Sequence, residues 1–172
     1  LLNFQLAYKN NFLFNLHRAE STEEISIFEN IIYVILELAD TITVVFPVHP
    51  RTRDCLERNG IWKSVIKHHN IITLNPLSYG SFIYIQSNAK VIVTDSGGVQ
   101  KEAAILGVHC ITIRDETEWV ETVESGWNQL VGRQPNSISK LVQDIEKPTS
   151  KQLTFYGDGK AAERIAKVIA KY

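Results

Sequence analysis

A β-branched run that leads through two glycines into a helix-forming segment constrains the fold of this chain most strongly. Val91-Ile92-Val93 is typical of a buried strand, and Thr94-Asp95-Ser96-Gly97-Gly98 follows it directly. The segment from Val99 to Leu106 then combines helix-forming residues with an apolar face. The order strand, small-residue turn, helix places free main-chain N–H groups at the mouth of a sheet. A helix N-terminus of this kind attracts phosphate.

Four residues of this segment suit a nucleotide. Gly97 and Gly98 let the main chain approach an anion closely, and Ser96 adds a hydroxyl donor. Glu102 lies about one turn inside the helix, where it would repel an adjacent phosphate but could accept two hydrogen bonds from a ribose diol. The pattern is neither the Gly-x-Gly-x-x-Gly nor the P-loop motif, so a simple turn with a solvated glutamate is the alternative interpretation.

Strand-like and helix-like segments alternate along the chain. We expect strands at residues 11–16, 42–46, 71–74, 91–94, 110–113 and 128–131. We expect helices at about residues 21–39, 54–59, 79–88, 99–106, 120–124, 137–146 and 160–171. This alternation predicts an α/β fold with a three-layer, Rossmann-like parallel sheet and right-handed crossovers.

Capping residues and apolar stripes add detail to two of these helices. Ser21 or Thr22 is the expected N-cap of the first. Its buried side should comprise Ile25, Phe28, Ile31, Ile32, Ile35 and Leu36. The closing amphipathic helix should turn Ala161, Ile165, Val168 and Ile169 inward.

Polar side chains follow four of the expected strands. His17, His49, Ser96 and Arg114 each come a few residues after a strand, and ligands of open α/β sheets bind beyond the carboxyl ends of the strands. The alternatives are structural. His17 could bond to main chain, and His49, between two prolines, could fix its loop. Arg51 could be part of a solvated helix start.

Composition excludes several other classes of function. The chain has 172 residues and a formal charge of −1, with no basic stripe, which argues against nucleic-acid binding. No apolar run is long enough to span a membrane, and no signal peptide is evident. Cys55 and Cys110 lack metal or redox spacing, so we expect a reducing, cytoplasmic location. His68-His69 has no third ligand, so we expect no metal site.

The length predicts a single domain over residues 1–172. The chain starts at Leu1 and contains no methionine, so we expect it to be a fragment of a longer protein.

Six segments in order along the chain carry a resemblance to a known family. The chain resembles the carboxyl-terminal half of the UDP-N-acetylglucosamine 2-epimerase family. The segments are His17–Glu20, His49–Thr52, Pro76–Tyr79, Thr94–Ala103, Arg114–Trp119 and Tyr156–Lys160. One departure is His109, which takes the place of a proline that is common in the family and packs beneath the site.

The resemblance implies the carboxyl-terminal domain of a glycosyltransferase-B type fold, in which two Rossmann-like domains enclose a UDP-sugar. The amino-terminal partner domain would be absent from this chain, and residues 160–172 would form a helix that crosses back towards it. The resemblance assigns diphosphate binding to Ser96, Gly97 and Gly98, ribose binding to Glu102, a position near the nucleotide to Arg114, a position near uracil to Phe82, and catalytic assistance to His17. Secondary candidates are Arg18, His49, Arg51 and Glu118.

The implied reaction converts UDP-GlcNAc to UDP-ManNAc by elimination and re-addition of UDP, with inversion at C2 and no cofactor. Epimerisation of another UDP-sugar, such as UDP-2,3-diacetamido-glucuronic acid, is an open alternative, as are a hydrolysing relative, a glycosyltransferase and a non-catalytic nucleotide-sugar-binding module. The carboxylates that move the C2 proton belong mainly to the absent half. Members of the family are often dimers, so the resemblance also allows a homodimer.

Overall fold

A computed structural model describes residues 10–133, 137–145 and 156–171 of the chain. Within these ranges a six-stranded sheet has the order β3-β2-β1-β4-β5-β6, and every pair of neighbouring strands is parallel. The strands are β1 (Asn11–Asn15), β2 (Thr43–Pro47), β3 (Ile71–Leu74), β4 (Val91–Thr94), β5 (His109–Thr112) and β6 (Asn128–Leu130). The helices are α1 (Ala19–Thr22), α2 (Ile25–Ala39), α3 (Pro50–Arg58), α4 (Trp62–Lys67), α5 (Tyr79–Asn88), α6 (Gly97–Leu106), α7 (Val120–Glu124), α8 (Ile138–Asp144) and α9 (Ala161–Ile169).

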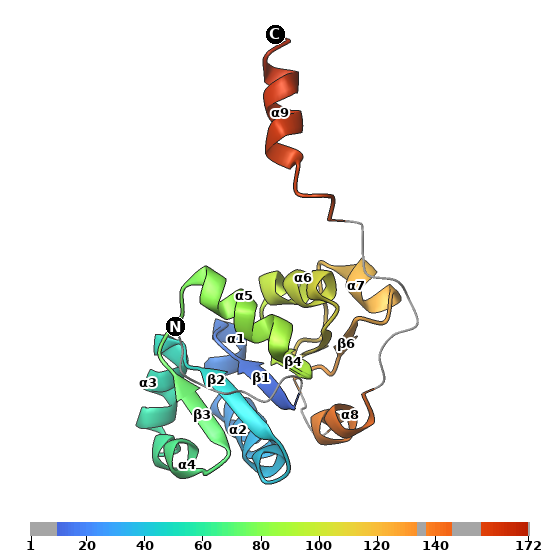
Figure 1. Ribbon diagram of the computed structural model, residues 1–172. Helices are drawn as coiled ribbons and strands as arrows, with labels where there is room; N and C mark the ends of the chain where they lie inside the picture. The colour runs from blue at the N-terminus through green and yellow to red at the C-terminus, as the bar shows by residue number, and fades with distance from the viewer. Residues whose placement is uncertain (1–9, 134–136, 146–155, 172) are drawn as a thin grey trace.

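The sheet is covered by helices on both faces (Figure 1). Successive side chains of a strand point to opposite faces, so β1 sends Phe12 and Phe14 to one face and Leu13 to the other. Phe12 and Phe14 pack in the larger apolar cluster, to which α2, α3, α4 and α8 contribute. Leu13 packs in the smaller cluster with side chains from α5 and α6. This confirms the predicted three-layer, Rossmann-like α/β fold.

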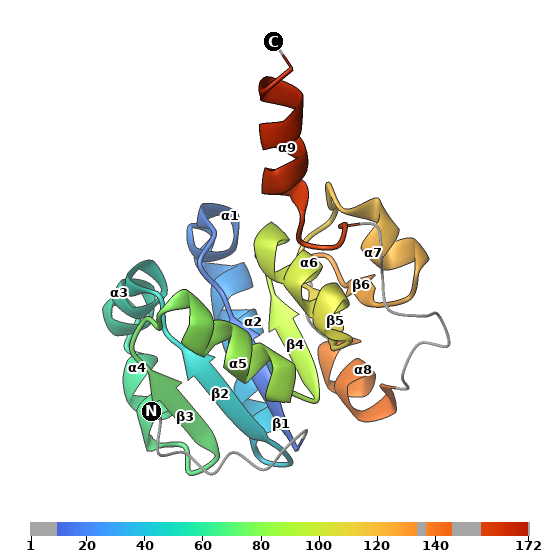
Figure 2. The same cartoon turned by 45° about the horizontal axis from the view of Figure 1, so that its top comes forward.

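The order of the strands reverses between β1 and β4. From β1 the chain proceeds outwards through β2 and β3, then returns to β4 and proceeds through β5 and β6 in the other direction. Figure 2 shows α1 and α6 near the carboxyl ends of β1 and β4, on either side of this point. Ligands of doubly wound sheets bind in the crevice outside such a switch point.

The strand predictions and five of the helix predictions hold to within about two residues, whereas the first two helices differ. Residues 19–39 form two helices, and the predicted cap is wrong: Ser21 and Thr22 lie within α1, and α2 follows Glu24 without a side-chain cap. Ile25 is exposed because it begins α2, away from the sheet. The helix predicted at residues 54–59 starts at Pro50, and α4 was not predicted.

The closing helix α9 stands away from the sheet in both views (Figures 1 and 2). Its apolar stripe does not turn inward as predicted, because Ile165, Val168 and Ile169 are 58%, 57% and 68% exposed. The link to the rest of the described chain is Tyr156, whose hydroxyl donates to Glu121 Oε1 at 2.7 Å. The apolar face of α9 is therefore uncovered by the residues that the structure describes. No helix in the described ranges is long and apolar enough to cross a membrane.

Candidate functional site

The turn between β4 and α6 forms an open cradle of main-chain N–H groups. Ser96 is the N-cap of α6 with extended backbone, and its side chain makes no capping hydrogen bond. Its own N–H donates to Thr94 Oγ1 at 3.0 Å, which holds the turn. Among the described residues, no hydrogen bond is made by the main-chain N–H groups of residues 97–99. These donors, with the positive end of the α6 dipole, can receive an anion.

The two glycines of this cradle differ in what surrounds them. Neither has a positive φ, so the backbone conformation requires glycine at neither position. A Cβ on Gly97 would collide with Glu118 Oε1 and lie 3.1 Å from Trp119 Nε1. A Cβ on Gly98, which is exposed, would approach only Ser96 Oγ, at 3.9 Å. The packing of the described chain therefore has room for a side chain at residue 98, and glycine there suits close approach by a ligand.

Asp95 connects the cradle to the end of β1. Its fully buried carboxylate accepts hydrogen bonds from the main-chain N–H of His17 at 3.1 Å and of Arg18 at 2.8 Å. The Nδ1 atom of His17 also lies 3.5 Å from Asp95 Oδ1. The carboxylate thus spans the switch point and orients both the loop and the imidazole. No role was predicted for Asp95, although an acidic residue directly after a buried strand is a signal of a functional or structural role.

The two histidines that follow β1 and β2 lie together, with ring centroids 5.5 Å apart. His49 Nδ1 accepts a hydrogen bond from the Arg51 main-chain N–H at 3.2 Å and so caps α3, with Pro50 in the first turn. Partial burial, followed by the nearby His17 and Arg51, lowers the pKa of His49, which favours the neutral ring that can accept this bond. His49 therefore has the structural role that the sequence analysis considered. The exposed Arg51 lies in the first turn of α3, as the alternative interpretation predicted.

The loop after β5 brings Arg114 and Glu118 to the cradle. Arg114 Nη1 donates to Glu118 Oε2 at 2.8 Å, and the guanidinium is largely buried, with 14% of the side chain exposed. The pKa of Glu118 is lowered, first by a hydrogen bond from its own main-chain N–H and then by the hydrogen bond from Arg114. The charges of Arg114 and Arg18 act in the same direction, so the carboxylate stays ionised. Asp95 holds the main chain of Arg18 beside the cradle, and Arg18 Nη1 lies 3.8 Å from Glu20 Oε2.

Buried polar contacts hold the remainder of this loop against α6. Thr117 Oγ1 donates to Gln100 Oε1 at 2.6 Å, and Asn128 Nδ2 donates to the same oxygen at 3.1 Å. The Lys101 ammonium lies 3.7 Å from the ring centroid of Trp119. The indole Nε1 of Trp119 is buried and has no hydrogen-bond partner among the described residues. Sequence reasoning missed this set of contacts.

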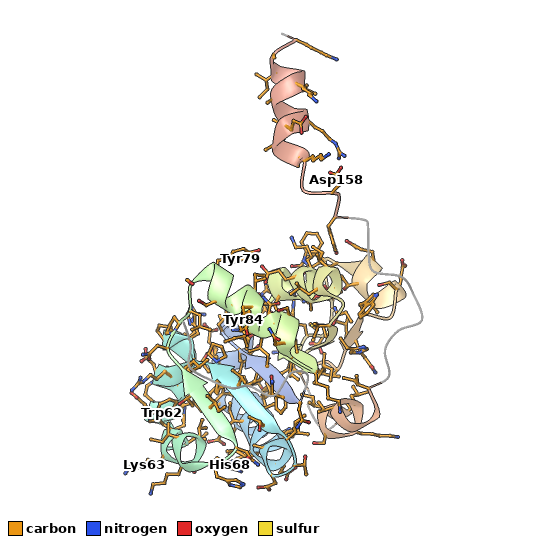
Figure 3. All side chains as sticks on the ribbon, viewed as in Figure 1. Trp62, Lys63, His68, Tyr79, Tyr84 and Asp158 are labelled. Carbon is orange, nitrogen blue, oxygen red and sulfur yellow. The ribbon has the colours of Figure 1, made fainter. Side chains whose placement is uncertain are left out.

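Glu102 lies further along α6 on the side of α5. Its Oε2 accepts a 2.6 Å hydrogen bond from Nε2 of the fully buried Gln86, which fixes the carboxylate and leaves Oε1 for another donor. Phe82, in the first turn of α5, is partly buried against the cluster beneath α5 and α6. Tyr79 and Tyr84 of the same helix are 70% and 64% exposed (Figure 3). The structure thus places Glu102 and Phe82 on one side of the cradle.

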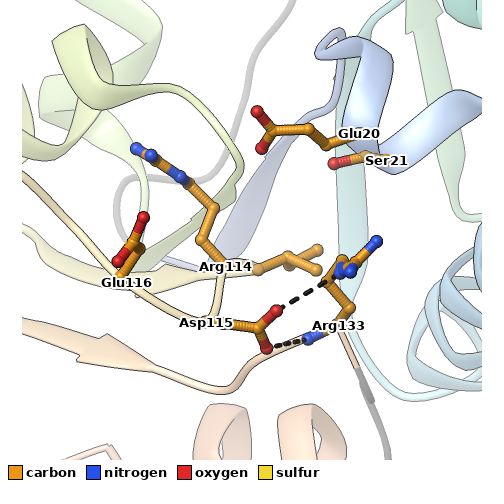
Figure 4. Close-up of a pocket in the computed structure, with 7 residues that line it drawn as sticks. Glu20, Ser21, Arg114, Asp115, Glu116 and Arg133 are labelled. Carbon is orange, nitrogen blue, oxygen red and sulfur yellow. Dashed lines mark hydrogen bonds and ion pairs between the residues drawn. The ribbon is translucent and has the colours of Figure 1, made fainter.

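A cavity of about 350 Å³ lies between α1 and the loop after β5 (Figure 4). It is lined by Glu20, Ser21, Ile113, Arg114, Asp115, Glu116 and Arg133. The Asp115 carboxylate accepts hydrogen bonds from the main-chain N–H and Nε of Arg133, each at 3.3 Å, and Arg114 extends away from that pair. Arg114 therefore borders both the cavity and the cradle. No group of three potential metal ligands occurs within the described ranges.

Known proteins match nearly the whole length of this chain. The protein-family model described as UDP-N-acetylglucosamine 2-epimerase matches residues 2–170. The chain belongs to the UDP-N-acetylglucosamine 2-epimerase family. A UDP-N-acetylglucosamine 2-epimerase homolog of Methanococcus maripaludis is 41% identical over 167 residues, which are 95% of this chain and 45% of that protein. The UDP-2,3-diacetamido-2,3-dideoxy-D-glucuronate 2-epimerase of Pseudomonas aeruginosa is 37% identical over 169 residues, covering 96% of this chain and 46% of that protein.

Solved structures of epimerases in this family share the fold. The Methanocaldococcus jannaschii UDP-GlcNAc 2-epimerase, crystallised with UDP-GlcNAc and UDP, has a TM-score of 0.86 at 36% identity, over 96% of this chain and 46% of that one. The Escherichia coli heptosyltransferase WaaC, with a TM-score of 0.60 at 16% identity over 83% of this chain and 46% of that one, shares the fold alone. The chain spans less than half the length of the curated relatives it matches.

Proposed function

We propose that this chain is the UDP-binding half of a UDP-N-acetylglucosamine 2-epimerase that interconverts UDP-GlcNAc and UDP-ManNAc. The observation that carries the proposal is the open cradle, where main-chain N–H groups without partners in the described chain surround an exposed Gly98. The family relationship supplies the ligand, since the Methanocaldococcus jannaschii relative was crystallised with UDP-GlcNAc and UDP. The diphosphate would lie on the first turn of α6, held by Ser96, Gly97 and Gly98.

Arg114, Arg18 and His17 would flank the diphosphate and stabilise the departing UDP. Cleavage of the C1–O bond leaves negative charge on the diphosphate, and guanidinium groups and helix N–H donors stabilise developing charge of this kind. Asp95 holds the main chain and ring of His17, so the imidazole would meet the diphosphate already oriented.

The nucleoside would extend from the cradle along α6. Glu102 keeps one carboxylate oxygen for the ribose hydroxyls while Gln86 holds the other. Phe82 would provide the apolar contact near the uracil ring.

The reaction requires a base for the weakly acidic C2 proton, followed by loss of UDP to form a glycal and re-addition of UDP after reprotonation on the opposite face. The carboxylates expected to carry this proton lie in the amino-terminal half of the relatives, outside this chain. The uncovered apolar face of α9, with Ile165, Val168 and Ile169, would pack against that half. The chain alone should bind UDP without turning over the sugar.

A second substrate is favoured by one observation. The Pseudomonas aeruginosa epimerase that acts on the diacetamido-glucuronate sugar aligns over 96% of this chain at 37% identity, close to the values for the UDP-GlcNAc enzymes. The two halves together would select the sugar, so the nucleotide contacts described here serve either substrate.

Product analysis tests the proposal. Each UDP-sugar is incubated in D2O with the 172-residue chain, and with the same chain joined to the amino-terminal half of a relative, and products are followed by ¹H NMR. We expect C2 deuteration and UDP-ManNAc from UDP-GlcNAc with the joined protein, and UDP binding without turnover with the chain alone. Turnover by the chain alone would overturn the division of roles. Turnover of the diacetamido-glucuronate sugar only would establish the second substrate.

A further inference from the structure

Glu118 lies at the entrance of the cradle, in the space that a side chain at residue 97 would fill. Its Oε1 contacts Gly97 so closely that even a methyl group there would collide with it. Its Oε2 accepts the Arg114 hydrogen bond at 2.8 Å. One carboxylate therefore touches the anion-binding turn and also takes an N–H donor of the guanidinium beside it.

The position of Glu118 conflicts with a diphosphate in the same cradle. Two anions side by side repel each other, and Arg114 cannot give the same N–H groups to both. The Glu118 carboxylate nonetheless lies there, and the charges of Arg114 and Arg18 favour its ionised form. The two arginines thus favour the Glu118 carboxylate by the same charge that would attract a phosphate.

The local packing lets the side chain move without the loop. The residues on either side of Glu118 are anchored, because Thr117 bonds to Gln100 and the Trp119 ring lies under the Lys101 ammonium. Glu118 itself is 46% exposed, and its carboxylate interacts with Arg114 and with its own main-chain N–H. The Arg114 side chain is only 14% exposed, so Glu118 leaves it at low cost only when another anion takes its place.

We propose that Glu118 competes with the ligand for Arg114 and so selects for the diphosphate, because only a more highly charged anion displaces the carboxylate. This inference rests on the proposed UDP site and adds a residue that sets its selectivity. Uridine, which carries no phosphate, cannot exchange with the carboxylate. A diphosphate offers several ionised oxygens in its place. Glu118 therefore acts on the phosphate part of the ligand through Arg114 and leaves the nucleoside contacts unchanged.

Calorimetry of UDP, UMP and uridine against the wild-type chain and Glu118→Gln tests this inference. Loss of the competing charge should increase the affinity for UDP about three- to tenfold and leave the affinity for uridine unchanged. In an Arg114→Ala background the same substitution should give a smaller gain, because no guanidinium is then released. Glu124→Gln is the matched control. It removes the same charge from an exposed position on α7 and should leave UDP affinity unchanged.

The outcomes separate the selectivity role from the site itself. UDP binding that is unchanged or weakened in Glu118→Gln would overturn the role of Glu118 and leave the UDP site intact. Weakening would mean that Glu118 positions Arg114 for the ligand. Tightening by the same factor in Glu124→Gln would reduce the effect to net charge and also overturn it. Absence of UDP binding to every variant, with folded protein by circular dichroism, would overturn the proposed function together with this inference.

Discussion

The buried carboxylate of Asp95 accepts a 2.8 Å hydrogen bond from the main-chain N–H of Arg18, a residue 77 positions earlier in the chain. The bond joins the loops after β1 and β4 at the point where the strand order reverses. Since His17 donates to the same carboxylate, one side chain satisfies two main-chain donors. The geometry of the site thus depends on a contact that also stabilises the fold.

Replacing Asp95 by Asn should destabilise the chain. Both main-chain N–H groups donate to Oδ2, so the Asn carbonyl oxygen can keep these two bonds. The Asn N–H2 group would then face the His17 N–H in place of Oδ1, and the charge that strengthens the bonds would be lost, which costs about 1–3 kcal/mol. Urea denaturation should show this decrease in the free energy of unfolding. An unchanged midpoint would contradict the role of Asp95 as the connection between the two loops. Asp54→Asn, at an exposed position on α3, provides the comparison.

Glu102→Ala should remove discrimination at the ribose. If Glu102 Oε1 accepts from the sugar hydroxyls, wild type binds UDP more tightly than 2′-deoxy-UDP, whereas the variant binds both alike. The loss of a hydrogen bond to a charged group should cost about 1.5–3 kcal/mol in UDP affinity. Calorimetry with both nucleotides measures the difference. Equal affinities in the wild type would place the ribose elsewhere.

The stability of the fold should rise with pH through the range in which His109 loses its proton. His109 is the first residue of β5 and so lies at the amino ends of the strands, whereas the cradle lies at their carboxyl ends. Burial lowers the pKa of His109 below the ordinary 6.5. The unfolded chain then binds more protons between the two pKa values, so stability is complete above pH 6.5 and falls as the pH decreases towards the folded pKa. His49, whose pKa is also lowered, contributes in the same direction.

The measurement is thermal unfolding of wild type and His109→Gln at a series of pH values from 5 to 8. The variant should lose part of the pH dependence while keeping its stability at high pH within about 1 kcal/mol. An identical pH profile in the two proteins would contradict the effect of burial on His109.

The apolar face of α9 should contribute little to the stability of this chain. Ile165 and Val168 are more than half exposed, so replacing both with Ser should change the free energy of unfolding by less than about 0.5 kcal/mol. Chemical denaturation measures this change. A loss of several kcal/mol would mean that α9 packs against the sheet in solution.

Local sequence predicted the strands well because runs such as Val91-Ile92-Val93 have no competing assignment. The start of α3 was missed because its cap is the imidazole of His49, a residue rarely read as a capping residue, and Pro50 is in the first turn. The N-cap predicted at Ser21 or Thr22 was wrong because those residues form α1, where Thr22 Oγ1 donates to the Arg18 carbonyl.

The site was predicted only as far as its local parts. The Ser96-Gly97-Gly98 turn is contiguous, so its form as a helix N-terminus could be read from the sequence. The carboxylate of Asp95 and the contact of Glu118 with Gly97 depend on which strands are neighbours, and that order is not encoded by any short segment.

Gly98 and Gly80 offer the most direct test of the UDP cradle, since each is the second residue of a helix, with space for a methyl group and no positive φ. Alanine at either position should stabilise the chain by up to about 1 kcal/mol. Calorimetric titration of UDP into wild type, Gly98→Ala and Gly80→Ala then separates folding from binding. We expect Gly98→Ala to weaken UDP binding by about tenfold or more, and Gly80→Ala to bind UDP as wild type does. Wild-type affinity in a folded Gly98→Ala would contradict this expectation.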